Sequence, residues 1–293
     1  MPVELKNNKL SLIIELPEEG YSGARFDYTG KIRRVIYNGI EFGTTESEKY
    51  DLKKGCGFFN EFGIDSPLGY DEIKPGEEFI KPGVGYLIKE SDKPYDFFFE
   101  YKFRPFDFDY CIEQGKIIYR YLCNSSGYVF EAEKEIALTG NQFDIKYKIE
   151  NKGDKVIRTN EYVHNFISVN SEKISGTYRL IFPFEIIKEE IHKVIDKENN
   201  LIFGGNFLSW KNEPQTEYFL ENINCNCKAE WRIINRTYGC MISEMGNFAA
   251  SKINLWGKRH VVSPELYKKI ELNPGEKDEW IRTFTFDINI ENV

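Results

Sequence analysis

His164 is one of only three histidines in this sequence of 293 residues, and its neighbours suit proton transfer. It follows the alternating segment 143–150 and a turn, so we expect it on a β-strand beside the polar residues Asn160, Glu161 and Asn165. Imidazole exchanges a proton near neutral pH because its reference pKa is about 6.5. A buried histidine with a purely structural role is the plain alternative at this point.

Glu265 is the second candidate for proton transfer. It follows Pro264, which restricts the backbone before it, and it lies among the apolar residues Val261, Val262 and Leu266. A carboxylate in such surroundings can act as a general base, because burial and neighbouring charges tune its pKa. A solvated glutamate at the start of a strand is the plain alternative.

The composition excludes several classes of function. The 47 acidic residues outnumber the 39 basic ones and give a formal net charge of −8. This balance argues against binding nucleic acid or anionic membranes, which favour a basic surface. The three widely spaced histidines argue against a histidine-rich metal site, and Cys225 and Cys227 have no second cysteine pair at a finger-like spacing. A metal site built from histidines or from cysteine pairs is therefore not expected.

No segment of the sequence resembles a leader peptide or a membrane span. The six cysteines are therefore expected to be reduced thiols, and the protein is expected to be cytoplasmic.

Hydrophobic residues recur with a period of two rather than 3.6. The alternation over residues 143–150, and again over 284–290, is typical of strands with one buried face. Turn-forming pairs such as Asn38-Gly39 recur at short spacing. The sequence therefore predicts an all-β fold, a large antiparallel β-sandwich, with residues 1–293 forming a single domain.

Two segments depart from this pattern. Four apolar residues within 184–196 have helical spacing, which predicts a short helix, although their β-branched side chains weaken the prediction. Residues 67–84 are rich in proline and glycine and predict a long loop. Such a loop either builds a binding surface or closes one end of the sandwich.

Several short motifs resemble, in their order along the chain, the aldose 1-epimerase (galactose mutarotase-like) superfamily. They are residues 23–30 and 37–42, Thr159-Asn160 to His164-Asn165-Phe166, Ser263-Pro264-Glu265, residues 272–276 and Trp280. The resemblance spans nearly the whole chain. It implies the fold of that family, a large β-sandwich of the galactose mutarotase-like supersandwich type.

The resemblance also implies a reaction, the interconversion of the α and β anomers of an aldose. By that resemblance, His164 is the general acid that protonates the ring oxygen, and Glu265 is the base that takes the proton from the anomeric hydroxyl. The ring opens, the C1–C2 bond rotates and the ring closes on its other face, without a metal or a cofactor. A different alignment of the Thr-Asn motif puts Glu161 at the histidine position. We prefer His164, because imidazole donates protons at neutral pH.

The sequence departs from the family at a residue that contacts the sugar. Characterised mutarotases have a second histidine well before the catalytic one, and here no histidine precedes His164. Asn60 and Glu61, in the glycine-rich stretch 55–64, are candidates to replace it by binding sugar hydroxyls. The identity of the sugar therefore stays open.

Further candidate sugar contacts carry a charge, an amide or an aromatic ring. Arg25, Arg104 and Arg120 are candidates for the arginine of the family, Lys81 and Arg104 for contact with an anionic sugar, Asn165 for a hydroxyl, and Trp210, Trp231, Trp256 and Trp280 for packing against the sugar. Most aromatic residues must fill the core, so any single ring is more often structural.

We expect an isomerase of the aldose 1-epimerase type, acting on a monosaccharide or a sugar derivative. One alternative is a carbohydrate-binding or sensory protein that kept the fold and lost catalysis, which the missing histidine favours. Another is a lyase or hydrolase that uses a carboxylate pair such as Glu61 and Glu265. The isomerase requires His164 and Glu265 to face one cleft with room for a sugar ring. The oligomeric state is left open.

Overall fold

The computed structural model describes residues 1–290, and their regular structure is almost entirely β-strand. Within these residues the strands form two large sheets of ten strands each and one small sheet of three. No helix in this part of the chain is long and apolar enough to span a membrane.

The front sheet, the back sheet and the small sheet are named here with their strands in spatial order. The front sheet contains β1 (Val3–Lys6), β2 (Leu10–Glu15), β3 (Lys31–Tyr37), β5 (Phe58–Phe62), β13 (Ile157–Asn165), β22 (Val261–Leu272), β21 (Lys252–Lys258), β18 (Tyr218–Glu221) and β15 (Lys193–Ile195), with β4 (Ile40–Glu41) paired to β3. The back sheet contains β16 (Leu201–Gly204), β17 (Phe207–Trp210), β14 (Tyr178–Ile181), β19 (Cys227–Asn235), β20 (Cys240–Ala250), β23 (Lys277–Ile288), β12 (Gln142–Asn151), β11 (Tyr128–Thr139), β10 (Lys116–Ser125) and β9 (Asp109–Glu113). The small sheet contains β6 (Glu78–Lys81), β7 (Gly85–Ile88) and β8 (Phe103–Pro105), and two 3-10 helices are η1 (Tyr70–Glu72) and η2 (Lys188–Glu190).

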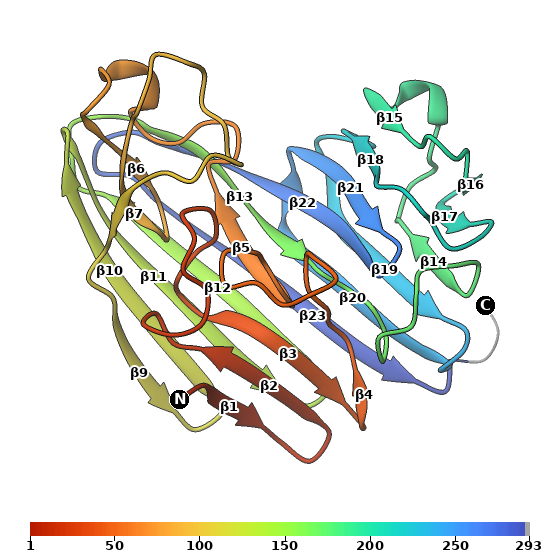
Figure 1. Cartoon of the computed structure of the whole chain (residues 1–293). Coiled ribbons are helices and arrows are strands. Elements are labelled where there is room, and N and C mark those ends of the chain that lie inside the picture. Colours follow the sequence, from red (N-terminus) through yellow and green to blue (C-terminus); the bar gives the residue numbers. More distant parts are fainter. Residues whose placement is uncertain (291–293) are drawn as a thin grey trace.

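The two large sheets pack face to face and enclose the main hydrophobic core (Figure 1). Phe58 of the front sheet meets Phe284 of the back sheet with 5.3 Å between ring centroids. Further along the same interface, Phe62 meets Tyr147 at 5.4 Å. Each of these strands turns its apolar face inward, as period-two alternation requires. The predicted large antiparallel β-sandwich is confirmed.

The alternating segments form the predicted strands. Residues 143–150 lie within β12, where the apolar residue at every second position is buried. The C-terminal segment belongs to β23, which ends at Ile288 rather than at residue 290.

Residues 184–196 do not form the predicted helix. Only Lys188–Glu190 make a turn of 3-10 helix, and Lys193–Ile195 form an edge strand paired to β18. The β-branched Val194 and Ile195 favour extended backbone. Pairing with β18 also gives their backbone groups hydrogen-bond partners.

Residues 67–84 are more ordered than the predicted loop. Tyr70–Glu72 form a 3-10 turn, and Glu78–Lys81 form a strand that pairs with β7. Leu68 and Ile80 exchange two backbone hydrogen bonds, which close the segment on itself. The prolines and glycines therefore mark turns within a small sheet.

A second hydrophobic cluster covers the outer face of the front sheet. We call it the outer cluster, and its buried aromatic members are Tyr21, Phe26, Tyr28, Phe59, Tyr70, Phe79, Tyr101 and Phe166. Because of this cover, the C-terminal half of β13 is buried on both faces. Polar side chains that point outward from β13 are thus held in a largely dry environment.

Three charged side chains are buried together between the sheets. Arg282 donates through Nη2 to Glu161 Oε2 at 2.7 Å and through Nη1 to Glu244 Oε1 at 2.6 Å. None of the three is exposed to solvent. Glu161 also accepts a hydrogen bond from Asn60 at 2.7 Å. The alignment that gives Glu161 the role of His164 is therefore incompatible with its position in the core.

Candidate active site

His164 and Glu265 lie side by side on the outer face of the front sheet. β13 pairs with β22 in a register that runs from Ile157 opposite Leu272 to Glu161 opposite Lys268. Carrying this register three residues further places His164 opposite Glu265. Their side chains meet with 3.5 Å between His164 Nε2 and Glu265 Oε1. They are only 3% and 4% exposed.

Each member of this pair is held by a hydroxyl group on its far side. Ser263 Oγ lies 2.8 Å from His164 Nδ1, which leaves Nε2 directed at Glu265. The Tyr267 hydroxyl donates to Glu265 Oε2 at 3.0 Å. Ser263, Glu265 and Tyr267 alternate along β22, so all three share the outer face.

Aromatic rings fix the plane of the His164 imidazole. The Phe166 ring stacks on it with 4.1 Å between centroids and 12° between planes. The Trp256 ring, from β21, meets it edge-on at 5.2 Å. The imidazole is therefore oriented before any ligand binds.

Burial shifts the pKa values of the pair in opposite directions. It raises the pKa of Glu265 to about 8, although the Tyr267 hydrogen bond and the positive charge of Arg25 act the other way. It lowers the pKa of His164 well below 6.5, and the charges of Arg25 and Lys258 add to this effect. Between these two pKa values the pair holds one proton, mainly on the carboxyl group, so neither group carries a buried charge.

Glu265→Gln is expected to stabilise the protein increasingly as pH rises from 4.5 to about 8. The pKa of Glu265 in the folded chain lies above its ordinary value of 4.5, so the folded state keeps a proton that the unfolded chain releases. The wild type therefore loses stability over this interval, and the variant does not. At about 1.4 kcal/mol per pKa unit, the difference reaches a few kcal/mol.

Denaturant unfolding at pH 5 and at pH 8 measures this effect. Glu271→Gln is the matched control, because Glu271 lies on the same strand with an exposed side chain. A stability difference for Glu265→Gln that is equal at the two pH values would contradict the raised pKa.

The pair lines a cavity of about 410 Å³. Pockets for small ligands typically measure about 300–1,000 Å³. Because His164 and Glu265 are almost fully buried, they lie at its bottom. Its walls include Tyr162, Phe219, Asn254, Trp256 and Tyr267 from the strands, with Arg25, Phe97 and Phe98 from loops. The remaining lining residues are mostly charged: Glu46, Lys54, Asp65, Glu217, Glu221, Lys252 and Lys258, with Ile64 and Ile195. A sugar ring has apolar C–H faces and polar hydroxyl groups. The aromatic rings of the lining can pack against the C–H faces, and the polar pair can bind the hydroxyl groups.

Arg25, one of the candidate sugar contacts, lines the cavity and is held in place by three acceptors. Its Nε donates to Glu61 at 2.7 Å, Nη1 to Glu46 at 3.3 Å and Nη2 to the Tyr162 hydroxyl at 3.2 Å. The Phe97 ring covers its guanidinium at 4.9 Å. A guanidinium has five N–H donors, so each Nη keeps one donor for a ligand.

Glu61 and Lys81 lie behind the cavity wall and do not line the cavity. Glu61 is fully buried and accepts hydrogen bonds from the Tyr162 hydroxyl at 2.6 Å and from Lys81 Nζ at 3.0 Å, besides the one from Arg25. Lys81 Nζ also donates to the Tyr95 hydroxyl at 2.9 Å. From these positions Glu61 holds the side chains of Arg25 and Tyr162 by hydrogen bonds, and Lys81 in turn holds Glu61. Neither residue reaches the cavity.

Four other predicted contacts lie away from the cavity. Asn60 and Asn165 are buried on the inner face of the front sheet, and Asn165 points there because it follows His164 on the same strand. Its Nδ2 donates to a main-chain carbonyl at 2.7 Å. Arg104 is exposed on β8, and Arg120 is exposed on β10. The structure therefore does not bring these four predicted sugar contacts together with His164 and Glu265.

Several lining residues were not predicted from the sequence. Tyr162 and Tyr267 stack on each other at 4.4 Å and stand two positions from His164 and from Glu265. Strand alternation alone puts each on the face of its neighbour, so this signal was present in the sequence. Phe97 and Phe98, in contrast, reach the cavity from a loop whose path no pattern reveals.

The four tryptophans divide between the cavity and the core. Trp256 lines the cavity beside His164. Trp210, Trp231 and Trp280 are at most 1% exposed and fill the core between the sheets. Only one of the four candidate rings is thus placed to pack against a sugar.

Among residues 1–290, no cysteine lines the cavity. The six cysteines are free thiols. Within residues 1–290, no three His, Cys, Asp or Glu side chains gather closely enough to hold a metal ion.

The whole chain is similar to solved structures of mutarotase-like proteins, while no family model and no curated protein sequence matches it. The galactose mutarotase related enzyme from Lactobacillus acidophilus superposes with a TM-score of 0.62 at 12% identity, over 100% of this chain and 99% of that one. A galactose mutarotase-like protein from Lactobacillus casei gives 0.59 at 10% identity, over 98% and 100%. The aldose epimerase homologue from C. elegans gives 0.53 at 11% identity, over 98% and 99%. The chain therefore has the galactose mutarotase-like fold.

Proposed function

We propose that this protein is an isomerase of the aldose 1-epimerase type, which interconverts the α and β anomers of a sugar by opening and closing its ring. The 3.5 Å approach of His164 Nε2 to Glu265 Oε1 at the bottom of the cavity supports this proposal most directly. The ring oxygen and the anomeric hydroxyl oxygen are bonded to the same carbon. An acid and a base this close together can therefore each contact one of them.

The protons balance over a full cycle. In ring opening, His164 Nε2 donates a proton to the ring oxygen while Glu265 takes one from the anomeric hydroxyl, which leaves a neutral imidazole and a protonated carboxyl group. After rotation about C1–C2, ring closure reverses both transfers on the other face of the aldehyde. The protonation state that burial favours in the free protein is thus the state reached at the open-chain intermediate. No oxidant, reductant or metal is required by this chemistry.

The surrounding residues support a sugar as the ligand. Trp256 offers an aromatic ring, and Arg25 offers N–H donors to hydroxyls. The acidic net charge supports a small-molecule substrate rather than nucleic acid or a membrane. We expect such an enzyme to act on free sugars in the cytoplasm.

A hydrolase or lyase that uses Glu61 with Glu265 has less support. Glu61 is fully buried, paired with Arg25 and Lys81, and outside the cavity. It has no path to a glycosidic oxygen.

The proposal is tested by polarimetry on freshly dissolved pure anomers of glucose, galactose, xylose and their uronic acids. At least one sugar is expected to approach its anomeric equilibrium faster in proportion to the protein concentration. Sugar binding without acceleration for any member of the panel would instead identify a non-catalytic carbohydrate-binding protein.

The activity is expected to fall as pH rises through about 8. Above that pH the His164–Glu265 pair loses its only proton, because the pKa of Glu265 is about 8 and that of His164 is lower. On the acid side, the activity is expected to persist at pH 6.5 and to fall only at a much lower pH. There a second proton adds to His164, and the pair no longer holds a single proton. The pH dependence of kcat/KM for a neutral sugar measures both limbs, and a rate that keeps rising from pH 8 to 9.5 after correction for the spontaneous reaction would contradict the assignment.

A further inference from the structure

A second cavity adjoins the first and shares a wall with it. It measures about 360 Å³, and we call it the annex. The residues lining both cavities are Arg25, Glu46, Lys54, Phe97 and Phe98. The two cavities therefore lie next to each other, on either side of these five side chains.

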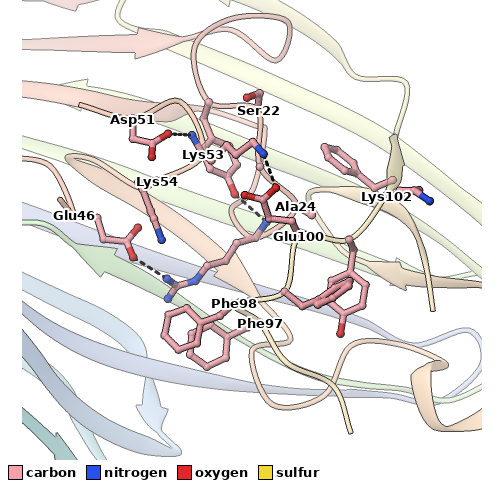
Figure 2. Close-up of a pocket in the computed structure, with 16 residues that line it drawn as sticks. Ser22, Ala24, Glu46, Asp51, Lys53, Lys54, Phe97, Phe98, Glu100 and Lys102 are labelled. Carbon is pink, nitrogen blue, oxygen red and sulfur yellow. Dashed lines mark hydrogen bonds and ion pairs between the residues drawn. The ribbon is translucent and has the colours of Figure 1, made fainter. Parts of the chain in front are cut away.

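Three consecutive phenylalanines form the edge of the annex. Phe98 is 68% exposed and Phe99 is 45% exposed, and the rings of Phe97 and Phe98 lie 4.1 Å apart between centroids. Figure 2 shows the Phe97 and Phe98 rings together, below the side chains of Glu46 and Lys54. Single exposed apolar residues are common on protein surfaces, but adjacent exposed rings at a cavity mouth suit packing against an apolar face of a ligand.

The polar lining of the annex combines both signs of charge. Asp51, Lys53 and Glu100 all line the annex and are labelled in Figure 2. Lys53 pairs with Glu100. A ligand with one strong charge would meet groups of its own sign here. A neutral ligand with many hydroxyl groups can donate to the carboxylates and accept from the ammonium groups.

We propose that the annex is a second sugar subsite, and that the substrate is a neutral oligosaccharide with a free reducing end. This inference rests on the proposed function, because it places the reducing-end sugar over His164 and Glu265. The next sugar along the chain then passes Lys54 and packs on Phe98 within the annex.

Disaccharides that share one reducing-end sugar test the subsite. Maltose, cellobiose and lactose all end in glucose, so glucose itself is the reference. At least one of the three is expected to show a kcat/KM for anomer exchange about ten-fold above that of glucose, the gain that one good stacking contact provides. If none exceeds glucose, the proposal is overturned.

Ser22→Trp is expected to close the annex and abolish this preference. Ser22 is exposed, its side chain lines only the annex, and its backbone N–H keeps its bond to Leu52 in the variant. Ser22→Arg repeats the obstruction without a new aromatic ring, and Ser22→Ala is the control that keeps the preference. A disaccharide preference that survives both bulky substitutions would overturn the proposal.

Binding measurements separate this inference from the proposed function. Calorimetric titration of wild type and Ser22→Trp with each disaccharide and with glucose requires no catalysis. If no sugar undergoes faster anomer exchange, the proposed function fails. Tighter binding of a disaccharide that Ser22→Trp removes would still support the subsite, and equal binding of glucose and all disaccharides would overturn it.

Discussion

Glu265→Gln is expected to lower kcat for anomer interconversion by about 10²–10⁴-fold, the range typical of a lost general acid or base. Glutamine keeps the size of the side chain and can accept the hydrogen bond from Tyr267, but it cannot take or return a proton. Sugar binding is expected to stay within a few-fold of wild type, since the walls of the cavity are unchanged. Polarimetry gives kcat, and calorimetric titration gives the affinity.

Glu271→Gln separates this effect from a general change of charge on β22. Glu271 is exposed and pairs with Arg158 at 3.0 Å, outside the cavity. Its kcat is expected to equal that of wild type. If Glu265→Gln retains more than about a tenth of the wild-type kcat, far less loss than a missing general base causes, Glu265 is not the base.

Arg282→Met is expected to destabilise the fold by about 3–5 kcal/mol, because it leaves Glu161 and Glu244 as carboxyl groups between the sheets without their cation. Burial already raises the pKa of Glu244, and Arg282 opposes that shift. Once Arg282 is removed, Glu244 takes up a proton more readily, so the loss of stability is expected to be smaller at pH 5 than at pH 8. Urea unfolding at both pH values measures the loss.

Arg120→Met is the matched control for the removal of an arginine from the back sheet. Arg120 pairs with Glu133 at 2.7 Å with more than half of its side chain exposed. Exposed pairs contribute at most about 1 kcal/mol, so its loss is expected to be small. A loss for Arg282→Met no greater than that for Arg120→Met would show that the buried charges do not stabilise the sandwich.

The sequence predicts the fold because strand alternation is a local pattern, and short motifs are enough to propose the central pair. Strict alternation in residues 143–150 identifies a strand with one buried face, and the observed β12 has that burial pattern. His164 and Glu265 could be proposed from short motifs, and the structure brings them to one cavity, which is the arrangement the isomerase requires. The prediction that residues 1–293 form one domain stays a prediction.

The details that the sequence missed depend on contacts between distant segments. Alternate residues of β5 face opposite sides of the front sheet, and the pairing of β5 with its neighbours decides which of Asn60 and Glu61 faces outward. In the structure Asn60 faces the core. The roles of Glu61 and Lys81 depend on a network that joins residues from four segments of the chain. Phe97 and Phe98 reach the cavity through the fold of a loop, which has no periodic signal.

The proposed acid–base role of the His164–Glu265 pair is tested most directly by two-dimensional exchange NMR of sugars labelled with ¹³C at C1. In the presence of the wild-type protein, the α and β signals of at least one sugar in the panel are expected to exchange at a rate proportional to protein concentration, and His164→Asn and Glu265→Gln are expected to remove this exchange while the sugar still binds. Sugars that bind in the cavity of the wild type without any protein-dependent exchange between their anomers would contradict the proposed function.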